Sequence, residues 1–294
     1  MNVAETPFLS TVELPRSVQI EPVAMQALRS PALMSLAAFG RVLDQFPRLG
    51  SLTLDGRGEP LSHPRIFDMV RYAAARGAAV TLRSRLPAAL GEERIEECVQ
   101  SGLQVLEVVL DQADPRRALG NARRIAAAKR RLASPLPELR AVLVATRSNI
   151  GYLVSLLRLA AAHDLREVRV QHLTRDFART RKYVATETLL NEDPTLLEPR
   201  FAELRAAAEM AHVRLELPQP RGRCDRPSRG VYLNYYGRAM PCDQVASNAP
   251  VGFGNMDREG VARVWSNDAY QAFRARLASD DPPEICKGCA LLQG

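Results

Sequence analysis

Runs of aliphatic and β-branched residues alternate with amphipathic helical patterns along most of the chain, at intervals of roughly 25–30 residues. The pattern predicts strands at 18–22, 51–55, 79–83, 105–111, 139–145 and 167–172, and a further strand at 213–218. It predicts helices at about 33–46, 63–76, 91–101, 115–133, 150–163 and 196–211. Strands that alternate with helices in this way form a parallel sheet, because each helix carries the chain back along the sheet. The fold class is therefore expected to be α/β.

The composition of the chain changes near residue 218. Residues 219–230, QPRGRCDRPSRG, are rich in Pro, Gly and Arg, which is typical of a linker. The 294 residues suffice for one α/β barrel and a small appended unit. We therefore expect one unit at 1–218 and a second at 219–294, which is too short for a large core and would gain stability from a bound metal.

Composition and charge narrow the class of protein. Apolar residues make up 46% of the chain and charged residues 25%, as in ordinary globular proteins. The chain has no run of about 18 uncharged apolar residues, so we expect no membrane span. Its first residues include Glu5 and Glu13 and lack the basic start and apolar stretch of a secretory signal, which favours a cytoplasmic protein. The net charge of +7 is a weak indication of an acidic partner.

Four of the five cysteines fall in the last quarter of the chain, at Cys224, Cys242, Cys286 and Cys289. The first two flank a predicted hairpin with Gly237 at its turn, and the last two form a C-x2-C knuckle. In a reducing compartment, metal ligands are expected rather than disulfides. Four thiolates saturate a [4Fe–4S] cluster or hold a structural zinc ion. Most zinc sites use two such knuckles, so the spacing favours the cluster and leaves zinc and incidental thiols open.

Other notable residues receive structural interpretations. Cys98 lies in a predicted helix and is expected to be a buried thiol. The aromatic residues of the last segment are expected to form its core: Trp265, Tyr270 and Phe273. Paired arginines recur every seven residues in the helix at 115–133: Arg116, Arg117, Arg123, Arg124, Arg130 and Arg131. We interpret this stripe as a solvated outer face, with an acidic peptide or nucleic acid as the alternative, and missing aromatic residues disfavour the nucleic acid.

Charged and imidazole side chains follow the predicted strands at Glu21, Asp55, Glu59, Asp111, Arg147 and His172. Barrel enzymes carry their chemistry at these strand ends, where such residues would supply a general acid and base. Their spacing shows no nucleophile and base in combination, so we favour ion pairing as their role.

The C-terminal motifs resemble the SPASM-type or "twitch" domain of radical-SAM proteins. The order is Cys224, Gly237 five residues before Cys242, then VGFGNMDREGVARVWSNDAYQAFRARL, then PPEICKGC. In that family the pattern holds an auxiliary [4Fe–4S] cluster, so the resemblance implies a cluster rather than zinc on the four C-terminal cysteines. A full SPASM domain carries further cysteines, whereas this chain ends in ALLQG, so one cluster is expected.

The α/β unit is similar to the same family over nearly its whole length. Residues 52–82, LTLDGRGEPLSHPRIFDMVRYAAARGAAVTL, resemble the family's second and third strands and the helix between them. The resemblance implies a partial (β/α)6 TIM-like barrel with a small cysteine-rich SPASM/twitch-like domain. Gly56, Gly58, Glu59 and Pro60 match the GEP element, which in the family contacts the amino group of S-adenosylmethionine (SAM). They imply a retained or vestigial SAM contact, and a tight turn is the structural alternative.

The resemblance breaks after the first strand. The family carries C-x3-C-x2-C there, whereas this chain has Gln26, Ser30 and Leu33 at those positions. Leu33 cannot ligate iron, and amide or hydroxyl oxygens are poor substitutes for thiolate. A second departure is Arg83-Ser84-Arg85-Leu86, where the family has a small Thr-Asn-Gly element near its cofactor. The SAM-cleaving cluster is therefore expected to be absent, and SAM binding is doubtful.

These departures predict a radical-SAM-like protein that is not an enzyme. Its roles would be scaffold, electron relay or partner protein with one [4Fe–4S] cluster, in peptide or natural-product maturation. The expected partner is a protein or peptide, such as an active radical-SAM enzyme. Two alternatives remain open: an active SAM-binding enzyme with non-standard chemistry in the barrel, and a zinc-stapled binding module.

Overall fold

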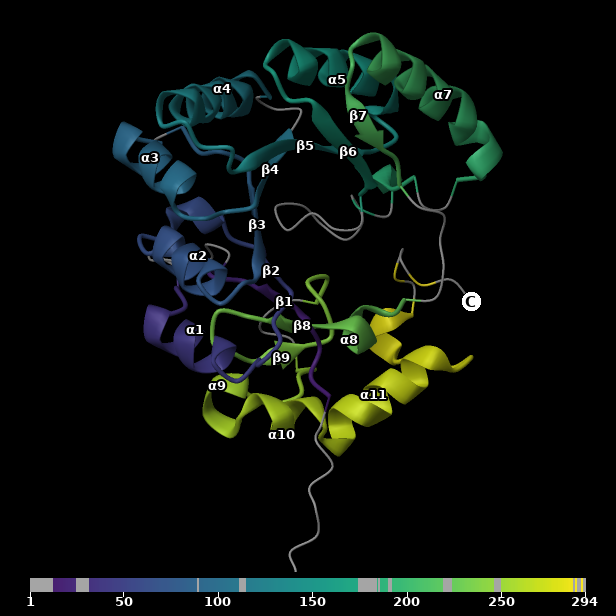
Figure 1. Cartoon of the computed structure of the whole chain (residues 1–294). Coiled ribbons are helices and arrows are strands. Elements are labelled where there is room, and N and C mark those ends of the chain that lie inside the picture. The colour runs from purple at the N-terminus through teal and green to yellow at the C-terminus, as the bar shows by residue number, and fades with distance from the viewer. Residues whose placement is uncertain are drawn as a thin grey trace, which may run out of the picture.

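The computed structural model describes residues 13–24, 32–88, 90–110, 115–173, 184, 186–189, 192–218, 224–245, 250–287, 289 and 292. In this part of the chain a nine-stranded sheet has the order β7-β6-β5-β4-β3-β2-β1-β8-β9. The sheet curves as an open arc, and helices cover its outer side (Figure 1). The architecture is thus a partial barrel, as predicted.

The alternating elements follow the predicted order. The parallel strands are β1 (Ser17–Ile20), β2 (Ser51–Leu54), β3 (Ala79–Ser84), β4 (Val105–Leu110), β5 (Glu138–Ala145), β6 (Glu167–His172) and β7 (Arg214–Glu216). The outer helices are α1 (Leu36–Leu43), α2 (Ile66–Ala74), α3 (Glu92–Gln100), α4 (Pro115–Arg131), α5 (Leu153–Ala162) and α7 (Pro194–Met210). Single 3-10 turns, η1 (Pro60–Ser62) and η2 (Ile150–Tyr152), precede α2 and α5.

Helix boundaries differ from the prediction where a cap intervenes. Helix α1 begins at Leu36 rather than at 33, because the Ser35 hydroxyl accepts a hydrogen bond from the Ala38 N–H at 3.1 Å. Leu33 instead forms a β-bridge with Val23. Just before α2, His63 Nδ1 accepts the Arg65 N–H at 3.0 Å. No described helix has the length and apolar character needed to cross a bilayer.

The two faces of the sheet differ in chemistry. Alternate residues of the central strands, such as Val80, Leu82, Leu106 and Val108, are fully buried in the core shared with the helices. The buried side of α4 includes Ala118, Ala122 and Ile125, as the pattern predicts. Its arginine stripe is exposed in part and pairs in part with α3, through Arg124 to Glu92 and Arg131 to Glu96.

The inner face of the sheet carries an ion-pair ladder across five strands. The aligned residues are Arg83, Glu107, Arg140, Glu167 and Arg214, so the charge alternates from strand to strand. Glu107 is 2% exposed and receives hydrogen bonds from Arg83 Nη2 at 2.6 Å and Arg169 Nη1 at 2.6 Å. Because each buried charge lies beside an opposite one, the ladder offsets much of the cost of removing these groups from water.

The C-terminal part continues the same sheet. Strand β8 (Gly230–Leu233) pairs in parallel with β1, and β9 (Ala239–Met240) pairs antiparallel with β8. The turn of this hairpin contains Gly237 with φ +78°, a left-handed conformation that favours glycine, so the predicted hairpin is confirmed. The predicted boundary near 218 stays a prediction, since the sheet runs on across it.

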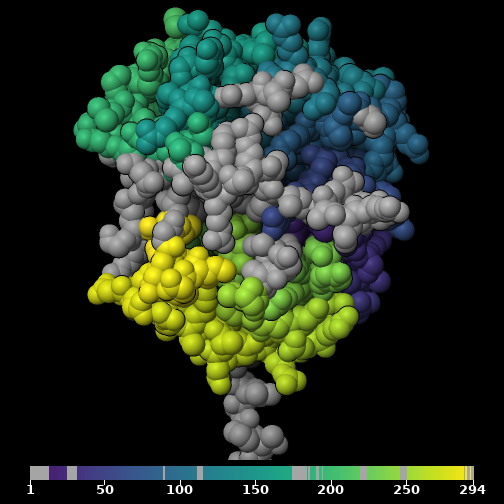
Figure 2. Space-filling model, turned by 180° about the vertical axis from the view of Figure 1, so that it is seen from behind, coloured from purple at the N-terminus to yellow at the C-terminus, as the bar shows by residue number. Residues whose placement is uncertain are grey.

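Short helices close the C-terminal part: α8 (Arg226–Arg229), α9 (Met256–Glu259), α10 (Val261–Trp265), α11 (Asp268–Ala278) and the 3-10 turn η3 (Glu284–Cys286). The predicted aromatic core is confirmed, because Trp265, Tyr270 and Phe273 are all buried. Helix α9 is tied to α1 by two hydrogen bonds from Arg41 to Asp257, at 2.7 and 2.9 Å. Figure 2 shows this junction, where the light-green C-terminal residues adjoin the purple N-terminal ones.

Candidate functional site

Three segments carry the four C-terminal cysteines. Cys224 precedes α8, Cys242 follows β9, and Cys286 and Cys289 lie in and after η3. Burial raises the pKa of the Cys242 thiol to about 12, with smaller contributions from Asp243 and Cys224. Burial also raises the pKa of the Cys286 thiol to about 11, and the charges of Cys289 and Cys224 add to the shift. Cys224 is itself influenced by Cys289, so it lies within electrostatic reach of all three other thiols.

Backbone N–H groups are directed at two of these sulfurs. The pKa of Cys224 is raised by burial, but the backbone N–H of Arg226 opposes the shift by hydrogen bonding to the sulfur. The N–H of Gln244 acts in the same way on Cys242. Each donor lies two residues after its cysteine, so a local turn supplies it. Such N–H···S bonds favour thiolate and are a recognised means of tuning iron–sulfur clusters.

An ion pair lies beside the thiols. Arg226 forms a salt bridge with Asp243, the residue that follows Cys242. Asp243 also accepts hydrogen bonds from Gln244 Nε2 at 3.2 Å and from Gln19 Nε2 of β1 at 3.4 Å. Burial by itself would lower the pKa of Arg226. The negative charges of Asp243 and of three cysteines outweigh burial and raise this pKa: Cys242, Cys224 and Cys289. Sequence reasoning missed this pair, although each partner stands within two residues of a predicted ligand.

In the described part of the chain, no three thiol, imidazole or carboxylate groups are close enough to hold a single metal ion. The fifth cysteine, Cys98, is 2% exposed in α3, and burial raises its pKa to about 12. A neutral thiol in that position is a core residue, as predicted. The thiols available for a metal centre are thus those of the C-terminal part.

The two glycines of the GEP element allow a close approach between chain segments. A Cβ atom on Gly56 would lie 2.4 Å from Glu21 Cγ, and one on Gly58 would lie 2.4 Å from the Val23 carbonyl oxygen. Any larger residue would push the turn after β2 away from the segment that follows β1. The glycines therefore have a packing role that does not require a ligand.

The Glu59 carboxylate is engaged by donors of the chain itself. Its Oε1 accepts from Ser84 Oγ at 2.6 Å and from the Leu61 N–H at 3.1 Å, and its Oε2 accepts from the Arg85 N–H at 3.0 Å. Pro60 begins η1 immediately after it. Ser84 and Arg85, which stand where the family has its Thr-Asn-Gly element, thus bind Glu59, and Arg83 belongs to the ion-pair ladder. Glu59 joins the turn after β2 to the end of β3.

Replacing Glu59 by glutamine should therefore destabilise the fold, because an amide supplies one acceptor oxygen and a mismatched NH2 group where three donors converge. We expect the free energy of unfolding to fall by about 1–3 kcal/mol. Urea denaturation would measure it. The control is Glu203→Gln, because Glu203 forms an exposed ion pair with Arg200 on a helix surface. Its unfolding free energy should fall by less than about 0.5 kcal/mol. Equal losses in the two variants would contradict this structural role of Glu59.

Three other strand-end residues are also engaged. Glu21 accepts the Arg57 N–H at 2.8 Å, and Asp55 pairs with Arg83 at 3.3 Å. Arg147 forms an ion pair with Glu192. Asp111 lies outside the described residues, as do Gln26 and Ser30 of the degenerate motif. Glu21, Asp55 and Arg147 therefore take part in ion pairs or backbone hydrogen bonds.

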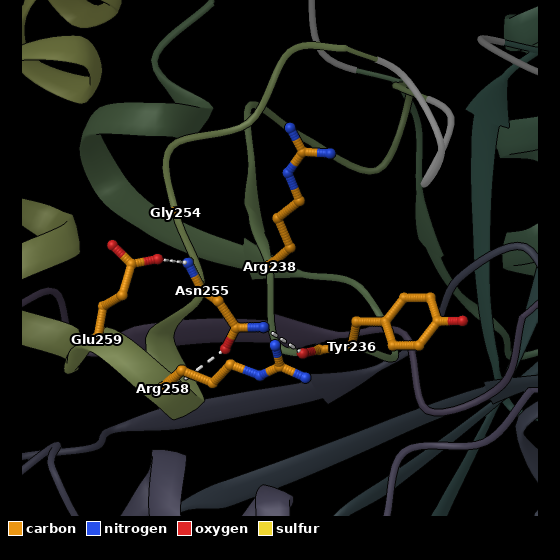
Figure 3. Close-up of a pocket in the computed structure, with 6 residues that line it drawn as sticks. All are labelled: Tyr236, Arg238, Gly254, Asn255, Arg258 and Glu259. Atoms are coloured by element: carbon orange, nitrogen blue, oxygen red, sulfur yellow. Dashed lines mark hydrogen bonds between the residues drawn. The ribbon is translucent and has the colours of Figure 1, made fainter.

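A surface pocket of about 370 Å³ lies at the hairpin turn, lined by Tyr236, Arg238, Gly254, Asn255, Arg258 and Glu259. Figure 3 shows that its two arginine side chains point in different directions. The Glu259 carboxylate accepts the Asn255 N–H at 2.7 Å instead of facing the arginines. The charges do not converge on a common point, so the pocket is not a candidate site.

Comparison with known proteins identifies the C-terminal part. Residues 224–290 match the model of SPASM, an iron-sulfur cluster-binding domain. The chain carries a SPASM domain. This match contains the four C-terminal cysteines, the hairpin and helices α8 to α11. No curated protein matches the chain.

Solved structures share the fold of nearly the whole chain. SuiB of Streptococcus suis bound to S-adenosylmethionine is 14% identical with a TM-score of 0.71, over 95% of this chain and 71% of SuiB. SuiB bound to its precursor peptide SuiA has a TM-score of 0.68 at 14% identity, over 95% and 70%. The enzyme anSMEcpe with bound AdoMet has a TM-score of 0.66 at 12% identity, over 95% and 85%. These likenesses show that the chain shares the partial-barrel fold of SuiB and anSMEcpe.

Proposed function

We propose that this SPASM protein holds one [4Fe–4S] cluster and does not cleave SAM, acting as a scaffold, electron relay or partner protein. The observation that carries the proposal is the distribution of sulfur. The SPASM domain has four cysteines, whereas Gln26, Ser30 and Leu33 occupy the positions of the family's three barrel thiolates. Cys98 is buried in α3 and does not replace them.

The thiol arrangement supports a cluster over zinc. Four thiolates around one zinc ion stand about 3.8 Å apart, given a Zn–S bond of about 2.3 Å in tetrahedral geometry. Among these four thiols the C-x2-C spacing occurs once, at Cys286 and Cys289, whereas most structural zinc sites use two such knuckles. A [4Fe–4S] cluster takes each thiolate on a separate iron and so accepts wider spacing. Cys224, Cys242, Cys286 and Cys289 would hold it.

The bound cluster would supply one-electron transfer with every iron already ligated by the protein. The chain's own residues would bind it through four thiolates and stabilise their negative charge through the N–H groups of Arg226 and Gln244. No iron would remain open to a substrate. This favours electron relay, stability or partner docking over direct chemistry at the cluster.

The hydrogen bonds and packing of the residues at the ends of β2 and β3 also support a non-catalytic role. The Glu59 carboxylate is occupied by three internal donors, and Gly56 and Gly58 are explained by close packing. Arg83 and Glu107 belong to the ion-pair ladder on the inner face. These residues have structural tasks that need neither SAM nor a substrate.

A peptide or protein partner is consistent with the structures that share this fold. SuiB has been solved with its precursor peptide SuiA, on the same fold as this chain. We propose that this chain works beside an active radical-SAM enzyme in the maturation of a peptide or other natural product. The competing role is that of a SAM-binding enzyme, which the SAM-bound state of SuiB favours.

The proposal is tested by metal analysis and SAM turnover on anaerobically purified protein. We expect about four irons and matching sulfide per chain, little zinc, and broad absorption near roughly 400 nm. With dithionite and SAM, we expect no 5′-deoxyadenosine above a no-protein control, while an active radical-SAM enzyme assayed in parallel produces it. Production of 5′-deoxyadenosine, about eight irons, or zinc without sulfide would each overturn the proposal.

A further inference from the structure

The Arg226–Asp243 ion pair joins two of the three segments that carry the thiols. Arg226 stands two residues after Cys224, and its own N–H is bonded to the Cys224 sulfur. Asp243 directly follows Cys242, and its side chain is 8% exposed. The salt bridge therefore fixes the distance between the segment before α8 and the segment after β9.

The pair is also hydrogen-bonded to β1 through Asp243. Asp243 accepts from Gln19 Nε2 at 3.4 Å, and Gln19 is aligned with Tyr232 across the β1–β8 pairing. Asp243 is also near enough to Arg83 to act on it electrostatically. Arg226 occupies the opposite end of this polar chain, two residues after Cys224 in the sequence.

We propose that Arg226 is a positioning residue that sets the reduction potential of the SPASM cluster by holding a fixed positive charge against its thiolates. The inference rests on the proposed function, since it requires the cluster to bind. Reduction by one electron from a low-potential donor, such as a flavodoxin-type or ferredoxin-type protein or dithionite, makes the cluster one charge more negative. A nearby guanidinium favours that state, because the attraction grows with the added charge.

Arg226 is suited to this role by charge and by attachment. A guanidinium stays protonated under all relevant conditions, so its charge does not depend on pH. The Asp243 carboxylate fixes its position and in turn is bound by Gln19 and Gln244, which limits side-chain motion. Arg229 of the same helix offers a comparison, because its side chain is 80% exposed, against 43% for Arg226, and pairs with Asp225.

The test is a redox titration of the reduced-cluster EPR signal in full-length wild type, Arg226→Gln, Arg226→Lys and Arg229→Gln. Iron and sulfide are measured first in the wild type. If the wild type holds no cluster, the proposed function is wrong, and this result is distinguished from a failure of the present inference. In Arg226→Gln we expect the equilibrium constant for reduction to fall about tenfold, or 59 mV towards more negative potential for a one-electron couple. Arg226→Lys should keep most of the wild-type potential, and Arg229→Gln should leave it unchanged because solvent screens that charge.

Two outcomes overturn the inference with the cluster intact. One is an equal potential in Arg226→Gln and Arg229→Gln. The other is an equal shift in Arg226→Lys and Arg226→Gln, which would make the cause packing rather than charge. Loss of iron in Arg226→Gln with retention in Arg226→Lys also overturns the inference, since Arg226 would then hold the cluster rather than set its potential. Loss in both variants overturns it.

Discussion

Substituting Cys286 by alanine will abolish iron binding in the SPASM domain. A cubane that loses one of four thiolates keeps an exposed iron corner, and this part of the chain offers no other free thiol to replace it, because the fifth cysteine is buried in α3. We expect iron to fall from about four per chain to near zero, together with loss of the absorption near roughly 400 nm.

The Cys286→Ala substitution should also make the C-terminal part of the chain less stable. The cluster would tie η3 and Cys289 to the segments around α8 and β9, and a small unit depends strongly on such a staple. Limited proteolysis should therefore cut Cys286→Ala faster after residue 218 than wild type. Cys98→Ala is the matched control, since it removes a buried thiol outside the site and should retain full iron. Wild-type iron content in Cys286→Ala would refute the ligand assignment.

Exchanging Glu107 for glutamine will cost the fold about 3–5 kcal/mol of unfolding free energy. This carboxylate is 2% exposed and is the shared partner of Arg83, Arg140 and Arg169. The neutral variant leaves several guanidinium groups on the inner face of the sheet with less countercharge, whereas the shape of the side chain is nearly preserved.

Urea denaturation gives the measurement, with a lower midpoint at an unchanged slope as the expected result. Glu216→Gln provides the control, because Glu216 binds Arg169 from a position that is 53% exposed. Its loss should stay within about 0–1 kcal/mol. Comparable losses in Glu107→Gln and Glu216→Gln would show that the ladder is a surface feature without a buried centre.

Local sequence signals predicted the elements and the cysteine-rich segment well. The period of apolar residues depends on neighbours within a few positions, so each strand and helix could be placed before the sheet was known. The turn at Gly237 was predictable because its left-handed backbone favours glycine. Helix starts were less certain, since a cap such as Ser35 competes with the apolar pattern for the first turn.

Local sequence patterns could not predict the contacts around the site. The ladder from Arg83 to Arg214 depends on the register of five strands, and no local pattern specifies which residues of separate strands stand side by side. The three donors of Glu59 and the Arg226–Asp243 pair likewise come from segments that only the folded chain brings together.

The sequence by itself determined the α/β pattern, the position of every cysteine and the lack of sulfur at residues 26, 30 and 33, because these follow from residue identity and short-range periodicity. The tertiary structure decided that β8 joins the sheet beside β1, that Glu59 is occupied by the chain's own donors, and that Arg226 pairs with the carboxylate next to Cys242. These features arise from contacts between residues far apart in the chain, whose pairing is set by how the whole sheet packs.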